Sequence, residues 1–394
     1  MSNTTLTTTT ETTETTAHLS DADVEALGAE LDAIRAEVMD DLGDDDARYI
    51  RRVIAWQRGL DAAGRGMLQF SLLPPAWLGG TAALSVAKIL ENMEIGHNVL
   101  HGQWDWMHDP EIHSSTWEWD SASSAEGWKY SHNYVHHTYT NVLGKDRDLG
   151  YAVFRVDPEQ PWKPWHLLQP LMNIGLAAGF EYGIAIYDIE LEEVIAGRKP
   201  WAQAKDELGG LWRKIRGQLL KDYIGFPLLS GMAAPTTLLG NLTANITRNV
   251  WSHAVIFCGH FPAGAETFTE EQLDGESRGQ WYLRQMLGSA NLDGSPLMHL
   301  MTGNLSHQIE HHLFPDMPSN RYAQVAPKVR DLCERYGLPY TSGPLHKQYA
   351  NVLATIARLA LPGGTAVDGN REDPGAASSG PRDGAHTPIG VGAA

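Results

Sequence analysis

Three histidine clusters restrict how this chain can fold, because distant imidazoles act together only if the fold brings them together. The clusters read HNVLH at residues 97–101, HNYVHH at 132–137 and HQIEHH at 307–312, and they hold eight of the 17 histidines. Imidazole nitrogen is a ligand for iron, zinc, copper and nickel. Eight imidazoles exceed what one four-coordinate ion uses. The sequence therefore predicts a site for two metal ions, built from several segments.

The spacing within the clusters favours ligands on shared helix faces. Residues i and i+4 of an α-helix lie about 40° apart around its axis. The first cluster has this spacing once, and the other two share the pattern HxxxHH, which adds a neighbouring imidazole. The metal ligands that we predict from the three clusters are His97, His101, His132, His136, His137, His307, His311 and His312.

Further candidate groups lie outside the clusters. His253 and His260 are seven residues apart, near the end of an apolar stretch, and both are predicted as additional ligands. The alternative is that each is a hydrogen-bonded histidine at an interface. We predict that Asn249, Asp146 and Asp148 contact ligand histidines without binding the metals, because such partners usually orient ligating imidazoles.

Other metal-dependent classes of protein fit parts of this pattern. His307, Glu310 and His311 form H-x-x-E-H, a zinc-metalloprotease pattern with a glutamate base. That motif leaves the other clusters unexplained, and metal analysis distinguishes it as one zinc rather than two iron ions. A membrane metal transporter would place histidines along a path inside apolar spans, whereas here they cluster at the ends of such spans. A haem-binding helix bundle would be excluded by the absence of a Soret band.

Apolar stretches at residues 66–100 and 223–259 suggest membrane insertion. A membrane-spanning helix needs about 20 residues, so each stretch is long enough for two short antiparallel helices. We expect two hydrophobic hairpins, with residues 165–187 interfacial or re-entrant. Basic residues between positions 198 and 221 favour the cytoplasmic side for the loop that holds them.

Composition divides the chain and excludes some functions. We expect an acidic, disordered region at residues 1–44, one catalytic domain at 45–345, and a helix end with a disordered tail at 346–394. A net charge of −18 argues against binding nucleic acid, which requires basic surfaces. The two cysteines give neither a disulfide framework nor a cysteine-rich zinc site.

The segments around the second and third clusters resemble those of a known family. HNYVHHTYTNVLGKDRDLGY at 132–151 and GNLSHQIEHHLFPDMPSNRY at 303–322 are similar to the second and third histidine boxes of membrane fatty-acid desaturases. The resemblance covers about residues 45–342. It implies an all-α fold in which integral membrane helices carry a cytoplasmic helical cap with a His-ligated diiron site.

Two departures from the family pattern bear on the ligands. The second box has one residue more than the family's usual HxxHH, and Gln308 stands where many desaturases have the leading histidine of the third box. We predict that His307 substitutes as the ligand, because imidazole binds iron better than a carboxamide, and that Gln308 lies beside the metal shell.

The resemblance also implies an activity and its partners. The expected reaction is oxygen-dependent introduction of a double bond into an acyl-CoA or acyl-lipid chain, with two iron ions as cofactor and O2 as co-substrate. An acyl hydroxylase or epoxygenase on the same scaffold is the alternative. No haem, dinucleotide or iron–sulfur motif is found, so we expect a separate electron donor, a ferredoxin or a flavin/iron–sulfur reductase. The expected location is the cell membrane, in contact with lipid, with the site facing the cytoplasm.

Overall fold

The computed structural model describes residues 14–364, which are predominantly helical, as predicted. The one sheet in this part of the chain has two short parallel strands, β1 (Asn291–Asp293) and β2 (Ser342–Pro344). Their register pairs Asn291 with Ser342 and Asp293 with Pro344.

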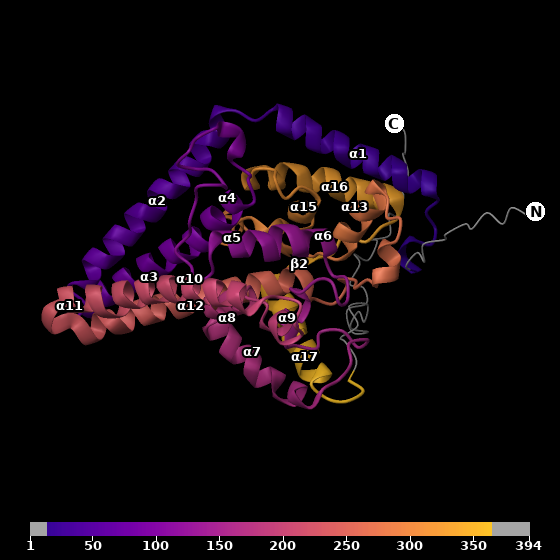
Figure 1. Ribbon diagram of the computed structural model, residues 1–394. Coiled ribbons are helices and arrows are strands. Elements are labelled where there is room, and N and C mark those ends of the chain that lie inside the picture. The colour runs from indigo at the N-terminus through magenta and orange to yellow at the C-terminus, as the bar shows by residue number, and fades with distance from the viewer. Residues whose placement is uncertain (1–13, 365–394) are drawn as a thin grey trace, which may run out of the picture.

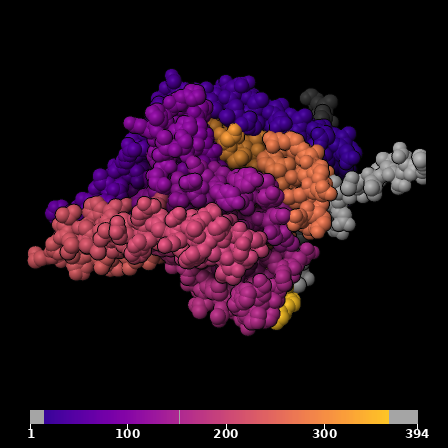
Figure 2. All heavy atoms as spheres, in the orientation of Figure 1, coloured from indigo at the N-terminus to yellow at the C-terminus, as the bar shows by residue number. Residues whose placement is uncertain are grey.

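Two helical hairpins form an arm that projects from one side of the molecule (Figures 1 and 2). One hairpin joins α2 (Asp44–Leu68) to α3 (Pro74–Leu90), and Pro74 and Pro75 begin α3, where a missing N–H does no harm. The other joins α10 (Trp201–Gln218), the π-helix η7 (Leu219–Gly225) and α11 (Phe226–Leu229) to α12 (Ala234–His260). Exposed apolar side chains gather at both turns, namely Phe70, Leu72, Leu73, Leu228, Leu229 and Met232.

The expected membrane-spanning helices are not found. Within residues 14–364, no helix has both the length and the apolar character required to cross a bilayer. The hairpins also contain buried charges: Lys88 on α3 and Arg65 on α2 both pair with Asp222 of η7, at 2.8 and 3.1 Å. Residues 165–187 contain two short helices, α7 (Gln169–Ala178) and α8 (Phe180–Tyr187), and their interfacial placement stays a prediction.

The remaining helices build a cap beside the arm. The α-helices of this cap are α4 (Asn98–Leu100), α5 (Ala125–Trp128), α6 (His137–Tyr139), α9 (Leu191–Ile195), α13 (Arg278–Leu287), α14 (Pro296–Met301), α15 (Gln308–Leu313), α16 (Tyr322–Tyr336) and α17 (Leu345–Leu359). The 3-10 turns are η1 (Glu14–Thr16), η3 (Asp105–Met107), η5 (Leu149–Ala152), η6 (Pro164–Leu168), η8 (Gly231–Ala233), η9 (Glu270–Leu273), η10 (Leu305–His307) and η11 (Ser319–Arg321).

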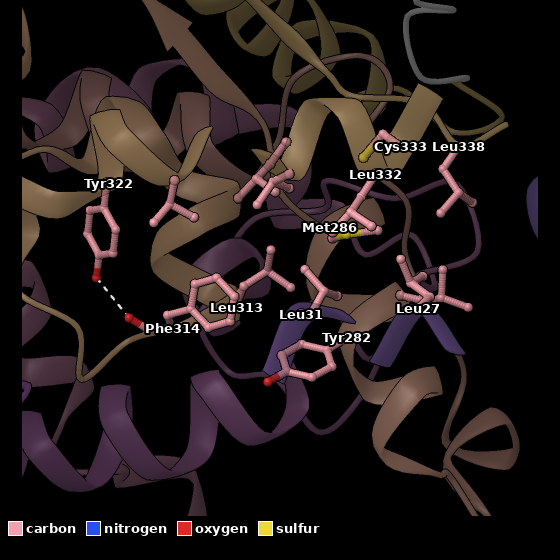
Figure 3. Close-up of a cluster of buried hydrophobic side chains, with 14 of the residues drawn as sticks. Leu27, Leu31, Tyr282, Met286, Leu313, Phe314, Tyr322, Leu332, Cys333 and Leu338 are labelled. Atoms are coloured by element: carbon pink, nitrogen blue, oxygen red, sulfur yellow. Dashed lines mark hydrogen bonds between the residues drawn. The ribbon is translucent and has the colours of Figure 1, made fainter. Parts of the chain in front are cut away.

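The N-terminal region contains a helix that covers the third histidine cluster. α1 (Asp21–Asp40) begins at a capping box between Ser20 and Asp23. Its residues Leu27 and Leu31 are fully buried, in one cluster with side chains of α13, α15 and α16 (Figure 3). The prediction that residues 1–44 are disordered is therefore wrong for residues 21–44, because the apolar face of α1 outweighs its acidity. Residues 1–13 and the tail from 365 lie outside the described residues.

The contact between α1 and α13 depends on two glycines. A Cβ on Gly28 would lie 3.0 Å from Gly279 Cα, and one on Gly279 would collide with the Val24 carbonyl. These backbones can approach so closely only because both side chains are absent.

Replacing Gly279 with alanine should therefore push α1 away from α13. We expect Gly279→Ala to lower the free energy of unfolding by about 1–3 kcal/mol, as overpacking does, measured by denaturant titration. Gly209→Ala, inside α10 and with open space at its Cβ, is the control and should be neutral or slightly stabilising. Equal stability of the two variants would contradict the close packing of α1.

Candidate metal centre

The first two histidine clusters include π-helical residues. The first cluster begins at the end of η2 (Glu91–His97), and the second lies in η4 (Lys129–His136) and α6. π-Helical turns, with hydrogen bonds from i to i+5, are rare and frequently mark functional sites. In the first cluster the His101 N–H still donates to the His97 carbonyl at 3.1 Å, which is the α-helical pattern that the spacing suggested.

One group of histidines combines all three clusters. The candidate ligand atoms of His97, His101, His132 and His311 all lie within 4.8 Å of one another. The ring centroids of His101 and His311 are 4.7 Å apart, and those of His97 and His132 are 5.3 Å apart. We call this set the first group.

The second group lies next to the first. His136, His260 and His312 bring their ligand atoms within 4.8 Å of one another. His137 lies between the groups, because its ring centroid is 4.7 Å from His101 and 4.4 Å from His312. A third, overlapping set combines His132 and His136 with Asp148. The structure therefore provides two adjacent sets of donors.

The hydrogen bonds of these imidazoles fit metal ligands. Nδ1 of His132 lies 3.2 Å from Asp148, Nδ1 of His136 lies 3.0 Å from Asp146, and Nδ1 of His311 lies 3.2 Å from the Tyr322 hydroxyl. The Nε2 atoms of these three histidines are buried and have no hydrogen-bond partner in the described protein. Buried polar atoms are normally satisfied, so a bound cation is the natural partner for these nitrogens.

Burial also favours the protonation state that a metal requires. Burial, followed by neighbouring imidazoles, holds the pKa values of His137, His311 and His312 well below the ordinary range. For His136, burial acts in the same direction, but the carboxylates of Asp146 and Asp148 outweigh it and raise the pKa. Neutral imidazole is the form that binds a metal ion.

His253 and Asn249 lie outside both groups. Nε2 of His253 is 3.0 Å from Asn173 Oδ1, and the ring stacks on Phe257 at 3.9 Å between centroids. Asn249 Nδ2 donates to the Ala178 carbonyl at 2.9 Å, and its Oδ1 accepts from Arg248. Neither residue therefore bonds to a histidine of either group, although Asn249 lines a cavity together with histidines of both.

His307 and Gln308 have the reverse of their expected places. The His307 ring stacks on His299 at 4.5 Å and belongs to neither group, whereas Gln308 Nε2 lies 3.0 Å from His260 Nε2.

The metalloprotease motif is not assembled either, because His307 and His311 do not share a group and Glu310 is bound by Asn291 and Tyr340.

Sequence reasoning missed several groups that hold the histidines. Asn98 Oδ1 lies 3.0 Å from His97 Nδ1, Gln285 Oε1 lies 3.0 Å from His312 Nδ1, and Tyr322 contacts His311. Asn98 adjoins its histidine in sequence and could have been proposed. Gln285 is 27 residues from its partner, and no local pattern marks it.

A cavity of about 60 Å³ adjoins the histidines of both groups. His97 and His132 of the first group and His136 and His260 of the second line it. Its other walls are mostly apolar and include Trp119, Trp128, Tyr151, Phe180 and Ile184. The indole of Trp128 stacks on His132, with 4.5 Å between ring centroids. An apolar molecule in this cavity would lie directly against the donor groups.

Comparison with known proteins assigns the family. The family model described as fatty acid desaturase matches residues 73–344. The chain belongs to the fatty acid desaturase family. It is 53% identical over 350 residues to the NADPH-dependent stearoyl-CoA 9-desaturase of Mycobacterium tuberculosis, covering 88% of this chain and 82% of that protein.

More distant desaturases are also similar. The sn-1 linoleoyl-lipid 6-desaturase of Synechocystis is 26% identical over 332 residues, covering 82% of this chain and 90% of that protein. Human fatty acid desaturase 3 is 22% identical over 306 residues, covering 73% and 63%. The resemblance inferred from the histidine boxes is therefore confirmed, and the chain is an enzyme of acyl desaturation.

The geometry predicts which third-box histidine binds metal in this desaturase. We expect His311→Ala to lose at least one of two bound metal ions, because His311 belongs to the first group. His307→Ala is the matched control and should retain both. Metal content after gel filtration, measured by inductively coupled plasma mass spectrometry, decides between them. Loss of metal in the His307 variant, with retention in the His311 variant, would refute this assignment.

Proposed function

We propose that this enzyme introduces a double bond at carbon 9 of a long saturated acyl-CoA such as stearoyl-CoA. The support for this substrate and position is the 53% identity to a stearoyl-CoA 9-desaturase over most of both chains. The observation that carries the chemistry is the apolar cavity that reaches both histidine groups.

The cofactor that fits these donors is a pair of iron ions. The first and second groups would each hold one ion, with His137 between them. A bound iron pair supplies, with O2, the oxidising power that an unactivated methylene requires and that acid–base side chains lack. In the balanced reaction, –CH2–CH2–, O2, two electrons and two protons give –CH=CH– and two water molecules.

The protein contributes orientation and the exclusion of water. The aromatic walls of the cavity fix an acyl chain beside the donor groups, and such proximity selects which carbons react. Asp146, Asp148 and Tyr322 hold the imidazoles at Nδ1 and so keep Nε2 directed to the metals. Burial of the histidines keeps competing water away.

We further propose that the apolar turns of the arm contact membrane lipid, where an acyl substrate partitions.

The cations that follow the second box do not form a free site for coenzyme A phosphates. Lys145 pairs with Glu270, Arg147 pairs with Glu190 and Glu192, and Arg155 donates to main-chain carbonyls. The two electrons come from a separate donor protein that NADPH reduces, in keeping with the dependence named for the mycobacterial relative.

The activity is tested by product analysis. Iron-loaded enzyme with stearoyl-CoA, O2 and a reducing system should give an acyl chain two mass units lighter, and fragmentation of its dimethyl-disulfide adduct should place the double bond at carbon 9. His101→Ala should lower the rate by at least about a hundredfold. His346→Ala, at an exposed histidine, should leave it unchanged.

Other products would overturn parts of the proposal. A product sixteen mass units heavier would identify a hydroxylase or an epoxygenase. A double bond elsewhere would refute the position but not the reaction. No conversion of stearoyl-CoA, with conversion of an acyl-lipid, would refute the coenzyme A carrier.

A further inference from the structure

Glu94 is a buried acid that the proposed reaction does not yet use. Its side chain is fully buried in η2, three residues before His97. Among the described residues, no lysine or arginine nitrogen lies within 4 Å of its carboxylate, in contrast to Asp222 and Glu181, which pair with cations. Burial without a nearby cation favours the neutral form of a carboxylic acid. The Glu94 side chain can therefore gain and lose a proton while it stays buried.

Neutral hydrogen-bond donors from three separate segments surround this carboxyl group. The Tyr49 hydroxyl of α2 donates to Oε1 at 2.8 Å, and the Ser319 hydroxyl of η11 donates to the same oxygen at 2.7 Å. Asn304 Nδ2, just before η10, donates to Oε2 at 2.9 Å. Glu94 interacts electrostatically with the titratable groups Tyr49 and Tyr322. These contacts tolerate both the ionised and the neutral acid.

Tyr49 contacts both Glu94 and an open cleft. It is half-buried and lines an open cleft of about 520 Å³, together with Asp46, Arg52, Asn320 and Arg321. Burial and the neighbouring Glu94 raise the pKa of Tyr49, so the phenol keeps its proton and remains a donor. Ser319, by contrast, is fully buried and is not among the residues that line this cleft. Of the two residues whose hydroxyls donate to Oε1, therefore, Tyr49 lines this cleft and Ser319 does not.

On its inner side, Glu94 is close to the first histidine group. Asn98 Nδ2 donates to the Glu94 main-chain carbonyl at 3.0 Å, and Asn98 Oδ1 lies 3.0 Å from His97 Nδ1. Glu94 is also three residues before His97 in the same π-helical segment, η2. Both side chains are buried, and charges interact more strongly in the low dielectric of a protein interior than in water.

We propose that Glu94 takes up a proton from the cleft through Tyr49 when an electron enters the metal centre. The hydroxyl proton of Tyr49 passes to Glu94 Oε1 while a proton from solvent binds the phenol oxygen in the same step, so that no phenolate forms. The electron comes from the donor protein, and the added proton cancels its charge. On turnover this proton is one of the two that leave in water. The inference rests on the proposed function, since that reaction consumes two electrons and two protons.

The first test uses metal-free protein and so does not depend on activity. Infrared difference spectra between wild type and Glu94→Gln should contain a protonated carboxyl band that shifts in D2O. The band should titrate between about pH 5 and pH 9, on either side of the pKa of about 7 to which burial raises Glu94. A Glu94 side chain that stays a carboxylate, or stays protonated, over this whole range would overturn the proposal.

The second test compares the two hydroxyls on Oε1. Tyr49→Phe should slow deuterium exchange at the Glu94 carboxyl by about a hundredfold, the lower end of what a positioned proton donor contributes. Ser319→Ala removes an equivalent hydrogen bond and is the matched control, with exchange at the wild-type rate. Equal exchange rates in the two variants would show that Tyr49 is not the route.

The third test separates this inference from the proposed function. Reduction of the iron-loaded protein, followed with a pH indicator, should take up about one proton fewer in Glu94→Gln than in wild type. Iron content, measured on the same samples, should be equal. Equal proton uptake would refute the role of Glu94 even if the enzyme desaturates stearoyl-CoA, and a deficit in Glu94→Gln would support it even if stearoyl-CoA is not the substrate.

Discussion

The site depends on buried imidazole nitrogens that have no hydrogen-bond partner among the described residues. The Nε2 atoms of His101, His132, His136 and His311 are removed from water without a hydrogen bond. Leaving a buried polar atom unpaired costs about 1–3 kcal/mol, and the metal ions of the proposed function would remove this cost. Asp146, Asp148 and Tyr322 hold three of the imidazoles at Nδ1, and α1 packs over the third box.

Much of this site could be predicted because the relevant signal is local. The spacing of the histidines in the first two boxes can be read directly from the sequence. Asp146 and Asp148 follow the second box closely enough to be predicted as hydrogen-bond partners of its histidines. The mostly helical fold and the family also follow from local motifs. His260 was one of two equal candidates in an apolar stretch, and the structure brings it, rather than His253, to the second group.

The remainder depended on contacts between distant segments or on deviations from ideal helices. Whether His307 or Gln308 faces the donors is decided by the turn from η10 into α15, which no spacing rule describes. α1 was obscured by its acidic composition, although the spacing of Leu27, Leu31 and Val38 indicated a buried face. The arm has apolar turns, but Lys88, within the first apolar stretch, pairs with Asp222, just before the second, which the sequence alone did not indicate.

The central claim is that two metal ions lie between these particular histidines. Diffraction from crystals of the iron-loaded enzyme, recorded on both sides of the iron absorption edge, locates each ion directly. The account predicts two anomalous peaks, one among His97, His101, His132 and His311 and the other among His136, His260 and His312. A single peak, or a peak bound by His307 or His253, would contradict it.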